Sequence, residues 1–353
     1  MKGLILSGGA GTRLRPITHT SAKQLVPVAN KPVLFYGLEA MRAAGIAEVG
    51  IVVGDTRAEI EAAVGDGSRF DLRVTYLPQE APLGLAHAVM IAEDFLGDSA
   101  FVMYLGDNLL KEGIAPFVQR FADTQPDALI LLQKVADPSA YGIAELKDGC
   151  VTRLVEKPAE PRSDLALVGV YIFTPAVFES VKAITPSPRG ELEITDAIQH
   201  MIDRGRRVES HIVKGWWKDT GKLEDMLEAN RLILSTIERD VRGTTTECIV
   251  EGPVVVGATS RLERCTVRGP VIIGERCHLA GAFIGPYTAI NDDVTIEDAE
   301  MENSIILEGS SVCSLSARMT DSLIGKNVSI RRSDARPVAY RFMVGDSSQI
   351  GIL

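Results

Sequence analysis

The sequence predicts an α/β fold in two parts: a doubly wound domain with a mixed, mostly parallel sheet, followed by a C-terminal parallel β-helix. The chain has 353 residues, which is long for a single hydrophobic core. Over residues 3–235, short β-rich runs alternate with helical patterns. The chain then becomes rich in valine, isoleucine and glycine, with a 17-residue repeat. We therefore expect one domain over residues 1–241 and a second over residues 242–353.

The first domain alternates expected strands with expected helices. That order favours a Rossmann-like sheet with helices on both faces, in which ligands bind beyond the carboxyl ends of the strands. We expect strands at residues 3–6, 49–53, 73–77, 101–105 and 128–134, and helices at residues 34–44, 59–64, 85–95 and 114–122. A last helical pattern at residues 223–239 leads into the polar run 242–246, where we expect the domain boundary.

The second domain carries its repeat at three positions of each 17-residue step. Starting from Val256 and from the positions six residues before and after it, 14 of 15 positions are apolar, including Leu307 and Cys313, and Arg318 is the exception. Ordinary strands rich in β-branched residues are the alternative, but chance would give this regularity only about twice in ten thousand trials. The repeat therefore favours a β-helix whose three sides each point one apolar residue inward.

The bulk composition excludes several classes of protein. With 46% hydrophobic and 24% charged residues the chain is globular, and its net charge of −10 argues against a nucleic-acid partner. No apolar run is long enough for a membrane span or a signal peptide, so we expect a cytoplasmic protein without a membrane partner. The five cysteines form no CxxC pair and are expected to be small buried residues in a reducing compartment: Cys150, Cys248, Cys265, Cys277 and Cys313.

A glycine-rich segment with a basic end directly follows the first expected strand. Gly8, Gly9 and Gly11 let the backbone approach a triphosphate closely and turn N–H groups toward it. Thr12 can add a hydroxyl as a hydrogen-bond donor, and Arg13 can bind a phosphate through its planar guanidinium group. The segment is no Walker A loop, since no Lys-Ser/Thr pair closes it, and no dinucleotide fingerprint, since the third glycine is missing. A structural turn is the alternative for the glycines alone.

A second segment, at residues 21–32, reads Ser-Ala-Lys-Gln-Leu-Val-Pro-Val-Ala-Asn-Lys-Pro. Together the two segments resemble the signature of the sugar nucleotidylyltransferases. Lys23 and Gln24 followed by leucine are similar to the thymidylyltransferase branch, whereas the guanylyl and uridylyl branches usually carry Lys-Pro or Lys-Glu. The resemblance covers the whole chain and implies a left-handed coil for the β-helix. It also implies that the glycine turn holds the nucleotide and that Arg13 and Lys23 stabilise the leaving pyrophosphate.

Further motifs resemble the nucleobase and metal positions of that family. Gln79 and Gly84 lie in a loop after an expected strand, and the resemblance assigns them, with Gln24 nearby, to the nucleobase. A polar loop that ends at a helix-starting glycine is the alternative. Asp107 ends another strand, and Asp219 lies in a later Trp-Trp-Lys-Asp motif. The resemblance implies that these two carboxylates hold Mg²⁺, the expected cofactor, although a lone aspartate before a turn is usually structural.

The remaining motifs resemble the half of the site that binds the sugar phosphate. Lys157 and Arg189 would hold the phosphate, and the other residues would surround the sugar. Glu191 and Glu193 are either part of this half or an ordinary acidic helix start. The five histidines match no ligand or base position and are expected to be structural or surface residues. The resemblance assigns six residues to this half: Asn108, Gly142, Glu156, Lys157, Tyr171 and Arg189.

The reaction that the resemblance implies is transfer of a deoxythymidylyl group from dTTP to glucose-1-phosphate by direct in-line attack, with release of pyrophosphate. Its expected catalytic residues are Arg13, Lys23 and Lys157. Three alternatives stay open: UTP or another sugar-1-phosphate as substrate, an acyltransferase seated on the β-helix, and a regulatory homologue without activity. No catalytic candidate lies beyond Asp219, so we expect the β-helix to serve assembly into a homo-oligomer.

Overall fold

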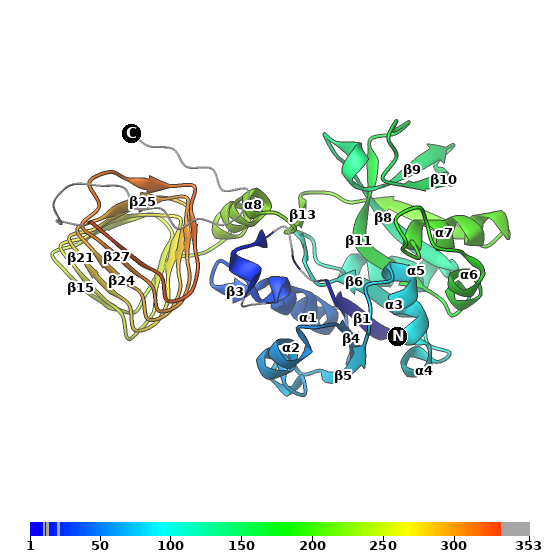
Figure 1. Cartoon of the computed structure of the whole chain (residues 1–353), viewed down its shortest axis with the longest axis horizontal. Helices are drawn as coiled ribbons and strands as arrows, with labels where there is room; N and C mark the ends of the chain where they lie inside the picture. The colour runs from blue at the N-terminus through cyan, green and yellow to red at the C-terminus, as the bar shows by residue number, and fades with distance from the viewer. Residues whose placement is uncertain (10, 12–13, 20–21, 333–353) are drawn as a thin grey trace. The chain divides into compact units, whose positions relative to one another are not determined.

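The computed structural model describes residues 1–9, 11, 14–19 and 22–332. This part of the chain forms two compact units (Figure 1). The first contains residues 1–9, 11, 22–26 and 31–221, and the second contains residues 14–19, 27–30 and 222–332. The second unit thus includes two short segments from near the N-terminus, and its main part begins at Lys222. A domain boundary between residues 241 and 242 stays a prediction.

One half of the sheet in the first unit is parallel (Figure 1). β1 (Lys2–Ser7) lies between β4 (Glu48–Val53) and β6 (Phe101–Leu105), and β5 (Arg73–Pro78) pairs with the far side of β4. Apolar residues dominate β1, β4 and β6 because a parallel sheet covered by helices is buried on both faces. The strands expected at these places are confirmed.

Antiparallel strands extend the sheet beyond β6, so the sheet is mixed, as predicted. β11 (Leu165–Phe173) is antiparallel to β6, to β8 (Ala128–Lys134) and to β9 (Gly142–Lys147). β10 (Cys150–Glu156) pairs with β9, and β12 (Val208–Ile212) pairs in parallel with β8. These strands carry several of the predicted sugar-phosphate residues.

Helices cover both faces of this sheet, as the alternation predicted. Along β1, Ile5 points to one face while Leu4 and Leu6 point to the other. The helix expected at residues 85–95 is divided at Ala92. The helices on the Ile5 face are α1 (Val33–Ala43), α2 (Arg57–Val64) and α5 (Ala115–Thr124). Those on the other face are α3 (Leu85–Ile91), α4 (Glu93–Leu96), α6 (Val177–Ala183) and α7 (Ile194–Asp203).

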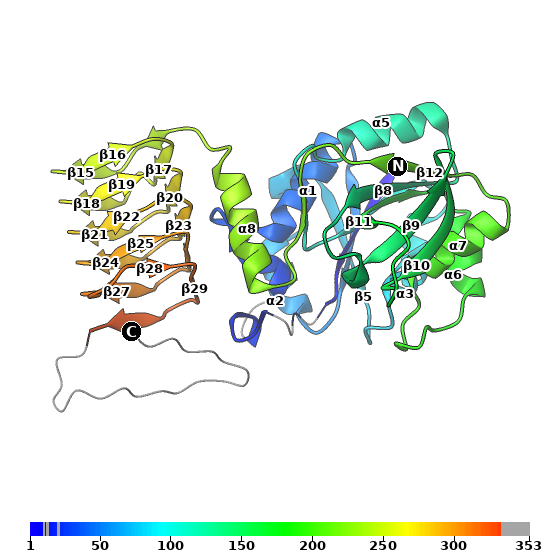
Figure 2. The same cartoon turned by 90° about the horizontal axis from the view of Figure 1, so that it is seen from above.

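Three parallel sheets form the three sides of a β-helix in the second unit, consistent with the left-handed coil that was expected (Figure 2). The first sheet consists of β14 (Asp240–Val241), β17 (Val254–Val256), β20 (Val271–Ile273), β23 (Thr288–Ile290), β26 (Ile305–Ile306) and β29 (Leu323–Ile324). The second consists of β15 (Thr244–Thr246), β18 (Arg261–Glu263), β21 (His278–Ala280), β24 (Thr295–Glu297), β27 (Ser311–Cys313) and β30 (Ser329–Arg331). The third consists of β16 (Ile249–Glu251), β19 (Thr266–Arg268), β22 (Phe283–Ile284), β25 (Glu300–Glu302) and β28 (Met319–Thr320).

The inward residues follow the predicted repeat except at three positions, each of which is wrong by one residue, and the predicted Ile324 and Ile330 are confirmed. Val256 pairs with Ile273 and Ile273 pairs with Ile290, as expected. In the next coil, however, Ile306 pairs with Ile290, so the prediction that placed Leu307 there is wrong. Leu307 is buried as well, but in a separate cluster on the outer side of this sheet.

The other two sides of the β-helix each contain one such displacement, by one residue toward the N-terminus on the second side and by one residue toward the C-terminus on the third. Val312 rather than Cys313 continues the second series, and Met319 rather than Arg318 continues the third. Arg318 lies on the outside, where its guanidinium group is 2.9 Å from Glu300. The 17-residue pattern could not reveal the shift because isoleucine and leucine, or valine and cysteine, stand next to each other at these places. Arg318, the single polar exception to the repeat, was the only sign of the displacement in the sequence.

The polar run at residues 242–246 forms part of the β-helix rather than a linker. Thr244–Thr246 is β15, and it pairs in parallel with β18. Before it, α8 (Leu223–Leu234) packs through Leu227 against Ala289 and Ile305 on the outside of the first sheet. The helical pattern therefore ends earlier than residue 239, and the β-helix begins earlier than its apolar repeat.

The cysteines are only partly as predicted. All five are free thiols, and Cys265 and Cys277 are buried. Cys150 is exposed, however, because it follows the tight turn between β9 and β10, and Cys248 and Cys313 are half-buried. In the described part of the chain, no helix is long and apolar enough to cross a membrane.

Candidate active site

Residues of the predicted site lie where the parallel strands end. Gly8 follows β1, Gln79 follows β5 and Asp107 follows β6. Because these strands are parallel, their carboxyl ends meet at the same edge of the sheet. The N–H of Gly106 donates to the carbonyl of Leu6 at 2.9 Å, which holds two of these strand ends together.

The backbone of the glycine segment lies directly against functional side chains. A Cβ on Gly8 would be 3.1 Å from Gln79 Oε1, and a Cβ on Gly9 would be 3.2 Å from Lys23 Cε. A larger residue would therefore intrude on an amide and an ammonium group. Gly11 has a left-handed φ of 63°, which glycine adopts without strain. Two residues predicted to bind the nucleotide lie outside the described residues: Thr12 and Arg13.

An ion pair joins Lys23 to Asp107. Lys23 lies in the short helix η3 (Lys23–Leu25), and its ammonium group contacts Asp107 Oδ2. Asn108 Nδ2 donates to Asp107 Oδ1 at 2.9 Å. Burial by itself would raise the pKa of Asp107, but the charge of Lys23 and these hydrogen bonds outweigh it and lower the pKa. Asp107 is therefore ionised at neutral pH, with a cation beside it.

A short antiparallel ladder brings the backbones of Asp107 and Asp219 close together. β7 (Asn108–Leu110) pairs with β13 (Trp217–Asp219) so that Asp219 lies opposite Asn108. The N–H and hydroxyl of Thr220 donate to the Asp107 carbonyl at 2.9 and 2.8 Å. Mg²⁺ is commonly held by one or two carboxylates together with phosphates, so this pair fits the ion. Among the described residues, no larger group of His, Cys, Asp or Glu is arranged to hold a metal.

The side chain of Asn108 is bound to internal partners. It is 2% exposed, and its Oδ1 accepts a hydrogen bond from Trp217 Nε1 at 2.5 Å while its amide donates to Asp107. A Cβ on Gly169 of β11 would be 2.6 Å from Asn108 Oδ1, so the neighbouring strand has no room for a side chain there. This geometry orients Asp107, and the sugar contact expected for Asn108 stays a prediction.

The loop after β5 is held against the loop before α7. Gly84 has a φ of 104°, and a Cβ there would be 2.7 Å from Leu192 N and 2.9 Å from Leu192 C. The Leu192 N–H donates to the Leu83 carbonyl at 2.8 Å, and the Leu192 carbonyl accepts from the Ala86 N–H at 3.0 Å. The backbone of Leu192 thus connects the predicted nucleobase motif, through hydrogen bonds, to the motif that carries Arg189.

Two amide side chains lie close to the glycine segment. Gln79 Nε2 is 3.0 Å from His87 Nδ1 and 3.4 Å from the Gly84 carbonyl. His87 therefore contacts a predicted base-reading residue, although we expected it to be structural or on the surface; its place in the first turn after Gly84 was the available signal. Gln24, beside Gly9, is 1% exposed, and its Oε1 has no hydrogen-bond partner within the described part of the chain. Such an oxygen is available to accept a hydrogen bond from a ligand.

The predicted sugar residues meet on β9 and β10. Gly142 pairs with Glu156, and a Cβ on Gly142 would be 3.1 Å from Glu156 Oε2 and 2.6 Å from Thr195 Cγ2. The hydroxyl of Thr195 donates to Glu156 Oε2 at 3.2 Å, and Lys157 Nζ is 3.8 Å from Glu156 Oε1. Burial, and then the charge of Glu193, raise the pKa of Glu156 above its ordinary value of 4.5.

Arg189 is surrounded by three carboxylates. Its guanidinium group lies 3.4 Å from Glu156, 3.1 Å from Glu191 and 3.2 Å from Glu193. Glu193 is 3% exposed and accepts a hydrogen bond from Ser187 Oγ at 2.8 Å. A cavity of about 750 Å³ adjoins Glu156 and Glu193. The sequence left the role of Glu193 open, and the structure places it in this charge network rather than on a solvated helix start.

Tyr171 lies in the core. Its ring stacks on Phe173 with 6.0 Å between the ring centroids, and it packs in the same apolar cluster as Leu4. Burial, and then the charge of Glu156, raise the pKa of its hydroxyl. The contact between Tyr171 and the sugar stays a prediction.

Comparison with known proteins agrees with the site. Residues 2–236 match the family described as nucleotidyl transferase. The whole chain is 55% identical to a glucose-1-phosphate thymidylyltransferase from Streptomyces antibioticus, of which 99% is covered. It is 49% identical to the low-salt glycan biosynthesis nucleotidyltransferase of Haloferax volcanii, over 99% of both chains.

The fold of the first unit is also found in solved structures. A structure from Bacillus anthracis, assigned as a glucose-1-phosphate thymidylyltransferase in complex with sucrose, has a TM-score of 0.63 and 36% identity. The match covers 66% of this chain and 94% of that one. A UDP-glucose pyrophosphorylase complexed with UDP-glucose matches at a TM-score of 0.60 and 28% identity, over 66% of this chain and 98% of that one. The chain therefore belongs to the nucleotidyl transferase family, and it is similar over its whole length to glucose-1-phosphate thymidylyltransferases.

Proposed function

We propose that this enzyme transfers the deoxythymidylyl group of dTTP to glucose-1-phosphate and releases pyrophosphate. The observation that carries the proposal is the single sheet edge where the glycine segment, Gln79, Lys23 and Asp107 lie together. An amide side chain beside the glycine backbone can bind the base of a nucleotide, and a cation beside a carboxylate can bind its phosphates together with a metal ion. The Streptomyces relative, which matches the whole chain, carries the name of this activity.

The nucleotide is proposed to bind along the ends of β1 and β5. The amides of Gln24 and Gln79 pair with the base edge, because each amide offers both a donor and an acceptor. Lys23 supplies positive charge for the pyrophosphate as it leaves, and Arg13 has the same role. The proposed nucleotide-binding residues are Gly8, Gly9, Gly11, Thr12, Arg13, Gln24, Gln79 and Gly84.

Mg²⁺ is the proposed cofactor, with Asp107 and Asp219 as its protein ligands. When bound, it neutralises and orients the phosphates of the two substrates. Neighbouring residues support this proposed metal site. Lys23 and Asn108 keep Asp107 ionised, and Thr220 donates to the Asp107 carbonyl and so holds the Asp107 backbone near Asp219.

The sugar phosphate is proposed to bind beside β9 and β10. Lys157 and Arg189 hold its phosphate, and Glu156 meets its hydroxyls next to Gly142. A phosphate monoester is already ionised at neutral pH, so its oxygen can attack the α-phosphorus without a general base. The barrier is then mostly the positioning of two polyanions, which Arg13, Lys23 and Lys157 lower by supplying charge. The proposed sugar-phosphate residues are Asn108, Gly142, Glu156, Lys157, Tyr171 and Arg189.

The β-helix is proposed to serve assembly into a homo-oligomer. Its outer faces carry paired charges such as Arg276 with Asp293 and Arg318 with Glu300, and none of the proposed catalytic residues. Light scattering on the purified chain measures this directly, and a monomer at micromolar concentration would contradict it. A cytoplasmic location stays a prediction.

A pyrophosphate-release screen tests the proposed function. The common nucleoside triphosphates are paired with glucose-, galactose- and mannose-1-phosphate, and we expect dTTP with glucose-1-phosphate to give the highest kcat/KM. UTP is expected to come next, because one methyl group in an apolar pocket contributes only about 1–3 kcal/mol. A preference for GTP or ATP would refute the proposal. Consumption of acetyl-coenzyme A with an amino-sugar phosphate would favour the acyltransferase alternative instead.

A further inference from the structure

Residues of the second unit border the segment that carries Lys23 and Gln24 on both sides. η2 (Ile17–His19) precedes this segment, and the turn Ala29–Asn30 follows it. Both belong to the compact unit that contains the β-helix, whereas Lys23 and Gln24 belong to the first unit. Described residues of the β-helix unit thus precede and follow, within a few positions in the sequence, two residues of the proposed nucleotide site.

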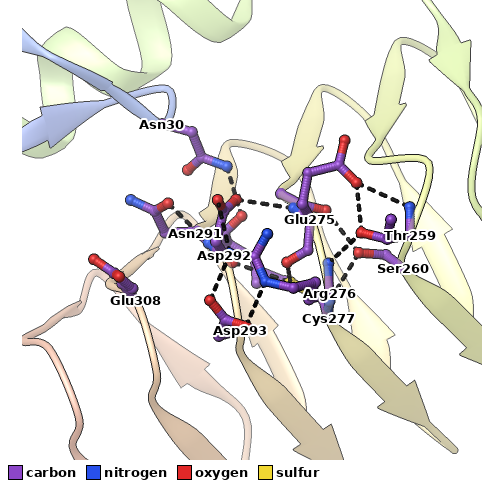
Figure 3. A network of polar contacts seen from close by, with 12 residues as sticks. Asn30, Thr259, Ser260, Glu275, Arg276, Cys277, Asn291, Asp292, Asp293 and Glu308 are labelled. Carbon is purple, nitrogen blue, oxygen red and sulfur yellow. Dashed lines mark hydrogen bonds and ion pairs between the residues drawn. The ribbon is translucent and has the colours of Figure 1, made fainter.

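The turn after the segment has a conformation that needs support. Ala29 and Asn30 have φ values of 48° and 61°, in the left-handed region that residues other than glycine adopt only when their surroundings stabilise it. The Ala29 N–H donates to Asn230 Oδ1 at 2.9 Å. Asn30 Nδ2 donates to the Ile290 carbonyl at 2.6 Å, beside the β-helix corner that carries Asn291 (Figure 3).

Asn230 connects this turn to the β-helix. It lies on α8 and is 0% exposed, so both ends of its amide need partners inside the protein. Its Oδ1 accepts from Ala29, and its Nδ2 donates to the Tyr287 carbonyl at 2.9 Å. One buried side chain thus joins the N-terminal turn, α8 and a corner of the β-helix.

A second contact borders the segment on its other side. Ile17 packs against a buried cluster on the outside of the first β-helix sheet, formed by Ala289, Ile305 and Leu307. This contact is apolar and independent of Asn230. Ile17 and Ala29, which precede and follow the segment in the sequence, are therefore both anchored within the β-helix unit.

The connection between the turn and the site is short and stiff. Pro27 restricts the preceding residue, and Val26 has the extended φ of −63° and ψ of 125° that this restriction favours. Val26 and Val28 are also buried, so their side chains limit movement further. We therefore expect a displacement of the turn at Ala29 to be passed along this short stretch of backbone to Lys23.

We propose that Asn230 is a positioning residue for the nucleotide site: by fixing the turn Ala29–Asn30 it fixes Lys23 and Gln24. This rests on the proposed nucleotide role of those two residues. It gives α8 and the β-helix a part in nucleotide binding, although their described residues include none of those assigned to the chemistry.

Asn230→Ala tests the proposal in the full-length protein. It leaves the Ala29 N–H without its buried acceptor, and we expect the KM for dTTP to rise about tenfold or more while the KM for glucose-1-phosphate changes little. Leu279→Ala is the control, because Leu279 lies in the interior of the same β-helix and its truncation loosens that unit without touching the turn. An unchanged KM for dTTP in Asn230→Ala, or an equal rise in Leu279→Ala, would overturn the proposal.

Two further variants separate positioning from general instability. Asn230→Asp keeps the acceptor for Ala29, so it should bind dTTP more tightly than Asn230→Ala. Ala29→Gly removes the strain of the left-handed turn, so in the Asn230→Ala background it should lower the KM for dTTP again. No recovery in either variant would mean that the conformation of the turn is not what matters.

Amide hydrogen exchange gives a readout that does not depend on the substrates. We expect residues 22–32 to exchange faster in Asn230→Ala than in the wild type and not in Leu279→Ala. If the wild type does not use dTTP but the exchange differs in this way, the proposed function fails and the anchoring role stands. Equal exchange in Asn230→Ala and the wild type overturns the anchoring role itself.

Discussion

Gly84→Ala tests whether the nucleobase loop and the Arg189 loop are held together by backbone contact. At a φ of 104° an alanine is strained by about 1–3 kcal/mol. Its Cβ would also be 2.7 Å from Leu192 N and 2.9 Å from Leu192 C, and these backbone atoms cannot rotate away. Displacing them adds about 1–3 kcal/mol, so we expect the free energy of unfolding to fall by about 2–6 kcal/mol.

Gly97→Ala is the matched control for this experiment. Gly97 also has a positive φ, of 56°, but a Cβ there would meet nothing within 4 Å. Only the backbone strain of the positive φ applies, so its expected cost is about 1–3 kcal/mol. The difference between the two variants isolates the contact with Leu192.

Urea unfolding followed by tryptophan fluorescence measures both variants. The chain's two tryptophans, Trp216 and Trp217, lie in the first unit, so the signal reports that unit alone. We also expect the KM for dTTP to rise in Gly84→Ala, because the loop that carries Gln79 must move. Equal losses of stability in the two variants, together with an unchanged KM for both substrates, would refute the reasoning.

The other predictions concern single side chains. Asp219→Asn should lower kcat roughly a hundredfold or more, and excess Mg²⁺ should restore part of that activity. Lys157→Ala should lower kcat about as much, and excess Mg²⁺ should not restore it. Pyrophosphate release measures kcat for both variants, and near-wild-type turnover in either would contradict the role assigned to that residue. Burial and the charge of Glu193 raise the pKa of Glu156, so the folded protein keeps that proton to higher pH than the unfolded chain. The contribution of Glu156 to stability is therefore largest below pH 4.5 and is lost as pH rises. Thermal unfolding from about pH 4 to about pH 8 should therefore show Glu156→Gln gaining stability relative to the wild type as pH rises, and a constant difference would contradict the raised pKa.

Local patterns were sufficient to predict the strands and helices of the first unit. The runs at β1, β4 and β6 are apolar at consecutive positions because both faces of the sheet are covered, and this signal is strong in a single sequence. The division of the helix at Ala92 and the early end of α8 were not predicted. Tertiary packing decides such ends, and it leaves little trace in local composition.

The β-helix shows where a periodic pattern fails. The repeat identified the fold, but it could not tell Ile306 from Leu307, because both are apolar and only one of them faces the interior. Thr244–Thr246 is a strand without apolar residues, so the first coil was read as a linker. Pairing with a neighbouring coil, rather than composition, determines which of Ile306 and Leu307 faces the interior and makes residues 244–246 a strand.

The predicted site residues were found by motif, and the contacts between them were not. Nothing in the sequence indicates that Asn108 faces Trp217 and Asp107, or that Glu193 is buried beside Arg189. The contact of Asn108 with Trp217, like that of Arg189 with Glu156, joins residues from separate motifs. Only the fold brings such residues together, so their roles as orienting groups emerge from the structure.

The stereochemical course at the α-phosphorus tests the central claim most directly. Direct in-line attack by glucose-1-phosphate on one diastereomer of dTTP carrying sulfur on the α-phosphorus must invert the configuration there. The account predicts a single dTDP-glucose product with a phosphorothioate of inverted configuration, identified by ³¹P NMR. Retention of configuration would require two displacements and a covalent enzyme intermediate, and it would contradict the account.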